Sequence, residues 1–161
     1  MLNVTALAEE LQELTAWQDT PQPLGAEDYI RIVKRAIRNF FVDINRASEF
    51  SEDNYITEEP ETTEEPETTE EPEEETPTEL ADIFYNRNFY ADEIVYILIL
   101  CQIEFFQRVQ TDVNNAFGYT TNALTVTNAD KPYKNLAETL NGLYNERRIK
   151  FNKMVRYTLG E

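Results

Sequence analysis

Few residues in this chain of 161 could carry out chemistry. Histidine is absent, which excludes a Ser-His-Asp triad, a Cys-His pair and a histidine-ligated metal. The four glycines are scattered, so they build neither a P-loop nor a dinucleotide-binding motif. Carboxylates alone can act as general acids and bases, but outside one acidic run no pair of acids stands out. We therefore expect no enzyme, no catalytic residue, no cofactor, no metal and no small-molecule substrate.

The single cysteine, Cys101, lies on the most apolar face of a predicted helix. No basic residue stands beside it in the local sequence, although a reactive thiol needs such a neighbour to lower its pKa. The pattern is typical of a small buried hydrophobe. One cysteine also allows no disulfide within the chain.

The basic side chains are better suited to binding a partner than to catalysis. They form two groups. The first group lies on one side of a predicted helix over residues 25–46 and consists of Arg31, Lys34, Arg35 and Arg38. The second group crowds the end of the last predicted helix and consists of Arg147, Arg148, Lys150, Lys153 and Arg156. We take all nine as candidate residues of a partner or subunit interface.

The two basic groups differ in arrangement. The first lies about a third of a turn from the buried stripe of its helix. It indicates either a solvated face or a contact with an acidic partner, which could be nucleic acid, a neighbouring subunit or the chain's own acidic segment. The second suits the dipole at a helix C-terminus. Because its members spread around the helix, they favour contacts on several sides over one groove-binding surface.

The acidity of the chain is concentrated in one segment. Residues 51–80 hold fourteen acids and no base, whereas residues 1–50 carry a net charge of −3 and residues 81–161 are neutral. Nearly all of the net charge of −17 therefore comes from that segment. The sequences on either side are close to balanced, as expected of a folded domain.

A repeat of period six makes up most of this segment. The motif Thr57-Glu-Glu-Pro-Glu-Thr recurs from Thr63 and from Thr69. The prolines prevent a regular helix, the glutamates repel one another, and no apolar side chain is available to offset the entropy of ordering. We predict a disordered, extended acidic loop. It serves either as a solvating spacer or as a surface that repels DNA or occupies a basic partner.

The most apolar helix is predicted from Ala91 to about Asn115, with a stop near Gly118. Its side chains are apolar on all faces, so other elements or other chains must enclose it. Its continuous apolar run, Ile94 to Ile103, is about half of the roughly 20 residues needed to span a bilayer. We therefore expect a core helix and no membrane.

Three further helices are predicted at the N-terminus and after the acidic repeat. The first runs from Val4 to about Trp17, capped by Asn3 or Thr5, with a buried stripe that consists of Val4, Leu7, Leu11 and Leu14. It docks either on its own domain or on a neighbouring chain. The second covers 25–46. A short third helix is expected from Thr78, with Leu80, Ile83 and Phe84 on its apolar face.

The last helix is predicted to start after Asn128 or Asp130. Its apolar face consists of Leu136, Leu140, Leu143, Tyr144, Phe151, Met154 and Val155. Gly142 inside it suggests a close helix crossing, because glycine otherwise costs stability there. A Thr/Asn-rich loop precedes it, and Leu124–Thr127 could form a short strand.

Together these elements predict an all-α fold, a bundle of about four principal helices. We assign N-terminal helices to residues 1–56 and the acidic insert to 57–78. Helices in 79–161 complete the same single domain.

This layout resembles the small helical head–tail connector, or adaptor, proteins of tailed bacteriophages. The resemblance covers 28–46 and 92–157. It comprises an early helix of the type Tyr29-Ile-x-x-Val-Lys-x-Ala-Ile, an apolar middle helix, a polar loop and a basic closing helix. The acidic repeat is not part of that family's pattern.

The resemblance implies a structural virion protein. Its subunits would form a homo-oligomeric ring in the neck, joining the portal to tail or neck proteins near packaged DNA, without catalysis or cofactor. It would be found in the virion after assembly in the host cytoplasm, or otherwise in the cytoplasm. One alternative is an acidic binding protein that uses the Glu/Pro repeat as a DNA mimic or decoy for a basic partner. A second is another capsid- or tail-associated virion protein.

Overall fold

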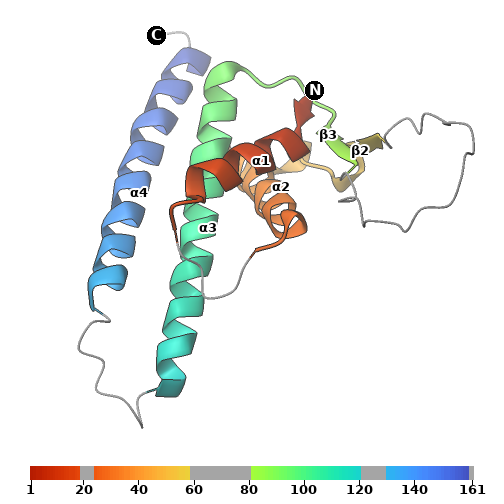
Figure 1. The fold of residues 1–161 in the computed structure, drawn as a ribbon. Helices are drawn as coiled ribbons and strands as arrows, with labels where there is room; N and C mark the ends of the chain where they lie inside the picture. The colour runs from red at the N-terminus through yellow and green to blue at the C-terminus, as the bar shows by residue number, and fades with distance from the viewer. Residues whose placement is uncertain (19–23, 59–80, 121–129, 160–161) are drawn as a thin grey trace, which may run out of the picture.

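Four long helices and a small sheet share one hydrophobic core (Figure 1). The computed structural model describes residues 1–18, 24–58, 81–120 and 130–159. In chain order these residues form β1 (Leu2–Asn3), α1 (Val4–Thr15), α2 (Ala26–Asp43), two short 3₁₀ turns, β2 (Tyr55–Glu58), β3 (Asp82–Tyr85), α3 (Ala91–Thr120) and α4 (Asp130–Leu159). The predicted all-α bundle of about four principal helices is confirmed.

The two N-terminal helices form where the polarity pattern predicts them. Asn3 caps α1 by accepting a hydrogen bond from the amide of Ala6. At the start of α2 the carboxylate of Asp28 accepts one from the amide of Gly25 at 3.2 Å. Val4, Leu7 and Leu11 are buried as expected, but Leu14 is 43% exposed. Its place on the predicted stripe is therefore wrong, because at this end of α1 the buried position is taken by Thr15, which is 2% exposed.

Helix α3 is the centre of the core, as predicted. It packs between α4 on one side and α2 and α1 on the other (Figure 1). Ile97, Cys101 and Phe105 are completely buried. By length and composition alone, Ala91–Asp112 could also cross a membrane, but half of that window is buried inside the protein. The helix continues through Gly118 to Thr120, so the predicted stop at that glycine is wrong.

A three-stranded antiparallel sheet replaces the short helix expected from Thr78. Residues 82–85 form the central strand, in the order β1-β3-β2, with Tyr85 opposite both Leu2 and Tyr55. The helix prediction is wrong here because pairing with two distant segments outweighs the local preference of a short apolar run. Strand β2 also includes Thr57 and Glu58, which were assigned to the insert. The rest of the insert, and the strand predicted at 124–127, lie outside the described residues.

Aromatic rings fasten the sheet to the helices. Tyr85 is fully buried, and its ring lies within 4.9 to 6.1 Å of four others, which belong to Phe41, Phe50, Tyr55 and Phe89. The guanidinium of Arg87 lies 4.7 Å from the ring centre of Phe41 and forms an ion pair with Glu93 at 3.5 Å. The side of the molecule opposite α4 is therefore closed by a packed aromatic cluster.

Helix α4 packs along α3 and extends with it past the other two helices (Figure 1). Leu136, Leu140 and Leu143 are buried, as predicted, whereas Tyr144 is 39% exposed. Gly142 is exposed, and a Cβ placed there would meet no atom within 4 Å. The predicted close crossing at this glycine is therefore wrong, since Gly142 faces away from α3.

Candidate interaction surface

Three arginines form a continuous row along the outer side of α2. Arg31, Arg35 and Arg38 lie four and three residues apart, so they share one face of the helix, and all three are exposed. We call them the α2 basic strip. The fourth predicted member, Lys34, is half-buried, and its ammonium lies 4.8 Å from the ring centre of Tyr55. Lys34 therefore contributes to holding β2 against α2.

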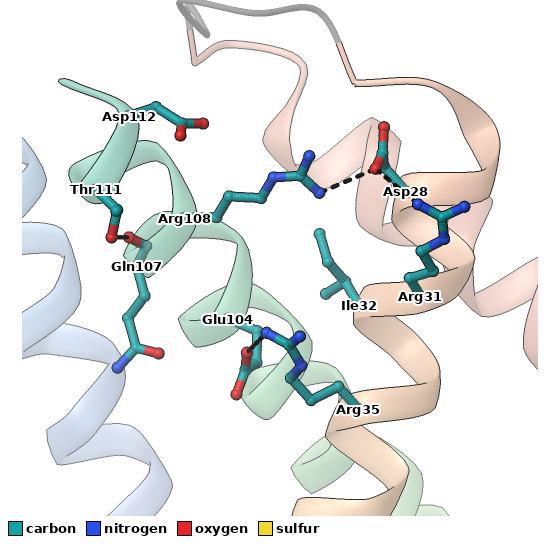
Figure 2. Close-up of a pocket in the computed structure, with 9 residues that line it drawn as sticks. All are labelled: Asp28, Arg31, Ile32, Arg35, Glu104, Gln107, Arg108, Thr111 and Asp112. Atoms are coloured by element: carbon teal, nitrogen blue, oxygen red, sulfur yellow. Dashed lines mark hydrogen bonds and ion pairs between the residues drawn. The ribbon is translucent and has the colours of Figure 1, made fainter. Parts of the chain in front are cut away.

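Arg31 and Arg35 of the α2 basic strip line a groove between α2 and α3 (Figure 2). The groove has a volume of about 520 Å³, and Ile32 lies between its charged groups. Three carboxylates and three guanidinium groups line it, from Asp28, Glu104, Asp112, Arg31, Arg35 and Arg108. The formal charges of these six groups cancel.

Ion pairs across the groove connect the two helices. Arg108 of α3 donates to Asp28 of α2 at 3.1 Å, and Arg31 lies 3.9 Å from the same carboxylate (Figure 2). Arg35 contacts Glu104 at 3.5 Å while its own side chain remains 72% exposed. Exposed pairs of this kind exchange readily with water and contribute little stability. The guanidinium groups therefore remain accessible to a partner.

The electrostatics of Asp28 follow from these contacts. The hydrogen bond from Arg108 lowers the pKa of its carboxyl below the usual value, and the hydrogen bond from the Gly25 amide lowers it further. Partial burial acts in the opposite direction but is outweighed. Asp28 is therefore ionised at neutral pH and holds two arginines at the N-terminal end of α2.

At the other end of α2, Arg147 forms an internal contact. Its guanidinium donates to both carboxylate oxygens of Asp43 at 2.7 Å and to the hydroxyl of Tyr96 at 3.2 Å. Tyr96 in turn donates to Asp43 at 2.7 Å. This closed cluster joins α2, α3 and α4. Arg147 was predicted as an interface residue, but its charge is already used inside the subunit.

The pKa values of this cluster reflect its burial. Burial and the hydrogen bond to Asp43 raise the pKa of Tyr96 to about 12, although Arg147 acts in the opposite direction. Burial alone would lower the pKa of Arg147, but its hydrogen bonds to Tyr96 and Asp43 raise it. At neutral pH the phenol of Tyr96 is therefore neutral and Arg147 is charged.

The remaining basic residues of α4 point in different directions. Arg148 and Lys153 are exposed and Lys150 is half-buried, and none of the three forms an ion pair with the described residues. Arg156 belongs to the same helix, but its side chain lies outside the part that the structure describes. The α4 cations thus form no row comparable to the α2 basic strip.

An acidic face on α1 was not predicted as part of an interface. Glu9, Glu10 and Glu13 are exposed on the side of α1 that faces away from the core, and none forms an ion pair with the described residues. We call them the α1 acidic strip. Their spacing was visible in the sequence as the polar side of an amphipathic helix, which is ordinarily solvated.

Cysteine and metal chemistry find no support among the described residues. Cys101 is buried and free, and burial raises the pKa of its thiol, so it is held as an unreactive hydrophobe. Within 1–18, 24–58, 81–120 and 130–159, no three acidic, histidine or cysteine side chains gather closely enough to hold a metal ion.

Comparison with known proteins adds no family. No family model, no curated protein and no solved structure matches this chain.

Proposed function

We propose that this chain is a structural virion protein, a ring-forming head–tail connector subunit that joins a portal to a tail. The proposal assigns it no catalysis and no cofactor. It rests on the resemblance of its helical layout to small connector proteins and on the charged helix faces that remain free in the single subunit. Homo-oligomers and portal, tail or neck proteins are the partners it implies.

The observation that carries this proposal is the α2 basic strip. Helix α2 buries its apolar side completely, with Val33, Ile37 and Phe40 at zero exposure. The opposite side presents three arginines in a row, followed one turn later by Val42, which is 57% exposed. A single exposed valine is common on a solvated surface, so the row of arginines carries the argument. A face that meets a neighbouring protein would use both the arginines and the valine.

The shape of the subunit also supports the proposal. Helices α3 and α4 lie side by side and extend beyond the layer of α1 and α2 (Figure 1). A subunit with distinct surfaces on different sides can form a heterologous contact, and such contacts close into rings when the rotation between copies permits it. A small globular protein with a uniformly polar surface would lack two distinct surfaces for a heterologous contact.

The test compares assembly of three purified proteins: the wild type, Arg35→Glu/Arg38→Glu, and a chain in which residues 58–75 are replaced by a short Gly/Ser linker. Mass by light scattering and ring formation by electron microscopy are measured for each. The proposal predicts rings for the wild type, folded but unassembled subunits for the arginine reversal, and assembly for the deletion. Circular dichroism verifies that both variants keep their helices.

The same experiment separates the connector from the acidic decoy. A decoy would bind a basic protein or column through residues 51–80, which carry a net charge of −14. Under that alternative, removal of the repeat abolishes binding and the arginine reversal has little effect. Normal assembly of the reversed protein, together with loss of a basic partner only on deletion, would exclude the connector function proposed here.

A further inference from the structure

We propose that the α1 acidic strip of one copy binds the α2 basic strip of the next copy. The inference rests on the proposed assembly and identifies the surfaces that build it. It commits to a second copy of this chain as the occupant of both faces.

The α1 acidic strip has the features of one half of such a contact. Glu9 and Glu13 lie one turn apart, and Trp17 follows after one more turn. The indole nitrogen of Trp17 donates to the carbonyl of Leu14 at 2.9 Å, and its ring lies 5.6 Å from that of Phe106. The side chain is thus held in place, yet it is 64% exposed. Fixed, exposed tryptophans are frequent anchors of protein interfaces.

The α2 basic strip supplies the complementary half. The three arginines span about 10 Å of α2, from Arg31 to Arg38, and Glu9 to Glu13 spans about 6 Å of α1. An exposed apolar side chain follows each strip, Trp17 after the glutamates and Val42 after the arginines. The two faces are therefore opposite in charge, and each has an apolar contact at one end.

Most charges on the two faces make only exposed contacts. Arg38 forms no ion pair with the described residues, and Arg31 pairs with exposed or half-buried acids of its own helix. Arg35 pairs with Glu104 of α3 at 3.5 Å, but its side chain is 72% exposed. Each exposed ion pair contributes little by itself. One subunit contact contains several such ion pairs and two apolar anchors. In a closed assembly this contact is repeated between all neighbouring subunits, so the small free energies of the single pairs add up.

The surroundings of the α2 basic strip favour a protein over DNA. Binding to a phosphate backbone depends on cations that neutralise several phosphates. The groove is lined by three carboxylates, and their charges are balanced only when Arg31 and Arg35 of the strip are counted together with Arg108. A helix face with separately placed carboxylates and a tryptophan offers partners both for the arginines and for Val42.

The test reverses each strip separately and then mixes the two variants. The acid-reversed variant is Glu9→Lys/Glu13→Lys, and the base-reversed variant is Arg35→Glu/Arg38→Glu. Each leaves a single protein with two strips of like charge, so each should remain a monomer where the wild type is fully assembled. An equimolar mixture restores one attractive pair at every contact, and should recover the oligomer. Light scattering after gel filtration measures the mass in each case.

A matched control changes the same charge outside the strips. Glu138→Lys/Glu146→Lys replaces exposed residues of α4. This control should assemble like the wild type. If a reversed variant loses its helical circular dichroism spectrum, Arg35→Gln/Arg38→Gln replaces it, and weaker assembly is expected from this neutral change.

The outcomes distinguish the interface from the proposed function. Recovery of assembly on mixing, with both single variants monomeric, supports the interface. Assembly of either reversed variant alone overturns this interface but leaves the ring proposal intact. Loss of binding to a fluorescent DNA duplex in the base-reversed variant, with unchanged self-association, assigns the strip to DNA and also overturns it. A wild type that stays monomeric at every concentration contradicts the ring proposal itself.

Discussion

The two ends of α2 each hold an aspartate bound to an arginine from another helix, but in different environments. At the N-terminal end Asp28 meets Arg108 at 3.1 Å beside an open groove. At the C-terminal end Asp43 meets Arg147 at 2.7 Å, and the phenol of Tyr96 completes the cluster. The Asp43 side chain is 17% exposed and that of Asp28 is 25% exposed, whereas the arginines are 35% and 41% exposed.

This comparison shows that geometry and the number of partners decide what an ion pair does. The Asp43 cluster has short hydrogen bonds among three groups from three helices, so removing one member leaves the other two half-buried with one partner fewer each. The Asp28 pairs are longer and open to water, so each member can be hydrated when its partner leaves. We infer that the first cluster fixes the bundle and that the second leaves its arginines available for binding.

The largest expected effect comes from Arg147→Met. The change keeps most of the length of the side chain but leaves Asp43 without its cation, and should lower the free energy of unfolding by about 2 kcal/mol. Urea denaturation followed by circular dichroism measures it. Arg148→Met, one residue along the same helix, is the control and should change stability by less than about 0.5 kcal/mol. Equal losses in the two variants would contradict the structural role of the cluster.

Tyr96→Phe should have the next largest effect. It removes only the hydroxyl that donates to Asp43 and accepts from Arg147, and should cost about 1 kcal/mol at neutral pH. The same denaturation experiment applies, and Tyr144→Phe serves as a comparison because the hydrogen bond that its hydroxyl accepts from Gln107 is exposed to solvent. A neutral result for Tyr96→Phe would mean that Asp43 and Arg147 hold the three helices without the phenol.

The cluster also predicts a pH dependence in alkali. The pKa of Tyr96 is raised from 10.0 to about 12 in the folded protein. Its contribution to stability is therefore complete below about pH 10 and is lost as the pH rises toward 12. Unfolding free energies of the wild type and of Tyr96→Phe should converge over that interval. A constant difference between them would refute the raised pKa.

Arg108→Met tests the open end of α2 and should have a smaller effect. An exposed pair contributes about 0–1 kcal/mol, and salt screens it. We expect a loss of a few tenths of a kcal/mol at low ionic strength that disappears in high salt. A loss as large as that of Arg147→Met would remove the distinction between the two ends.

The smallest effect is expected for Asp28→Asn in acid. Because the folded-state pKa of Asp28 lies below its ordinary value of 3.8, the ionised carboxylate contributes stability above that pH and loses it as the pH falls further. The wild type should therefore lose stability slightly faster than the variant below about pH 4. Parallel acid curves would show that Arg108 and Gly25 do not stabilise the carboxylate.

Local sequence patterns determined the helices of this protein. The recurrence of Val4, Leu7 and Leu11 predicted α1, and the apolar run around Ile97 predicted a buried α3. Both predictions were possible because the periodicity of apolar residues that marks a buried helix face is a property of residues close together in the sequence. The nearly balanced charge outside residues 51–80 was likewise evident. The cations of α2 were placed together on one side of the helix for the same reason, although Lys34 is half-buried over Tyr55 and does not belong to the exposed row.

Only the tertiary structure decided which elements pair across long separations. Residues 82–85 became a strand because Leu2 and Tyr55 lie on either side of them, and neither partner is near in sequence. Arg147 became an internal residue because Asp43, 104 positions earlier, meets it across the bundle. Local propensity is weak compared with the hydrogen bonds and burial that such distant contacts supply, so no reading of neighbouring residues could have assigned either one.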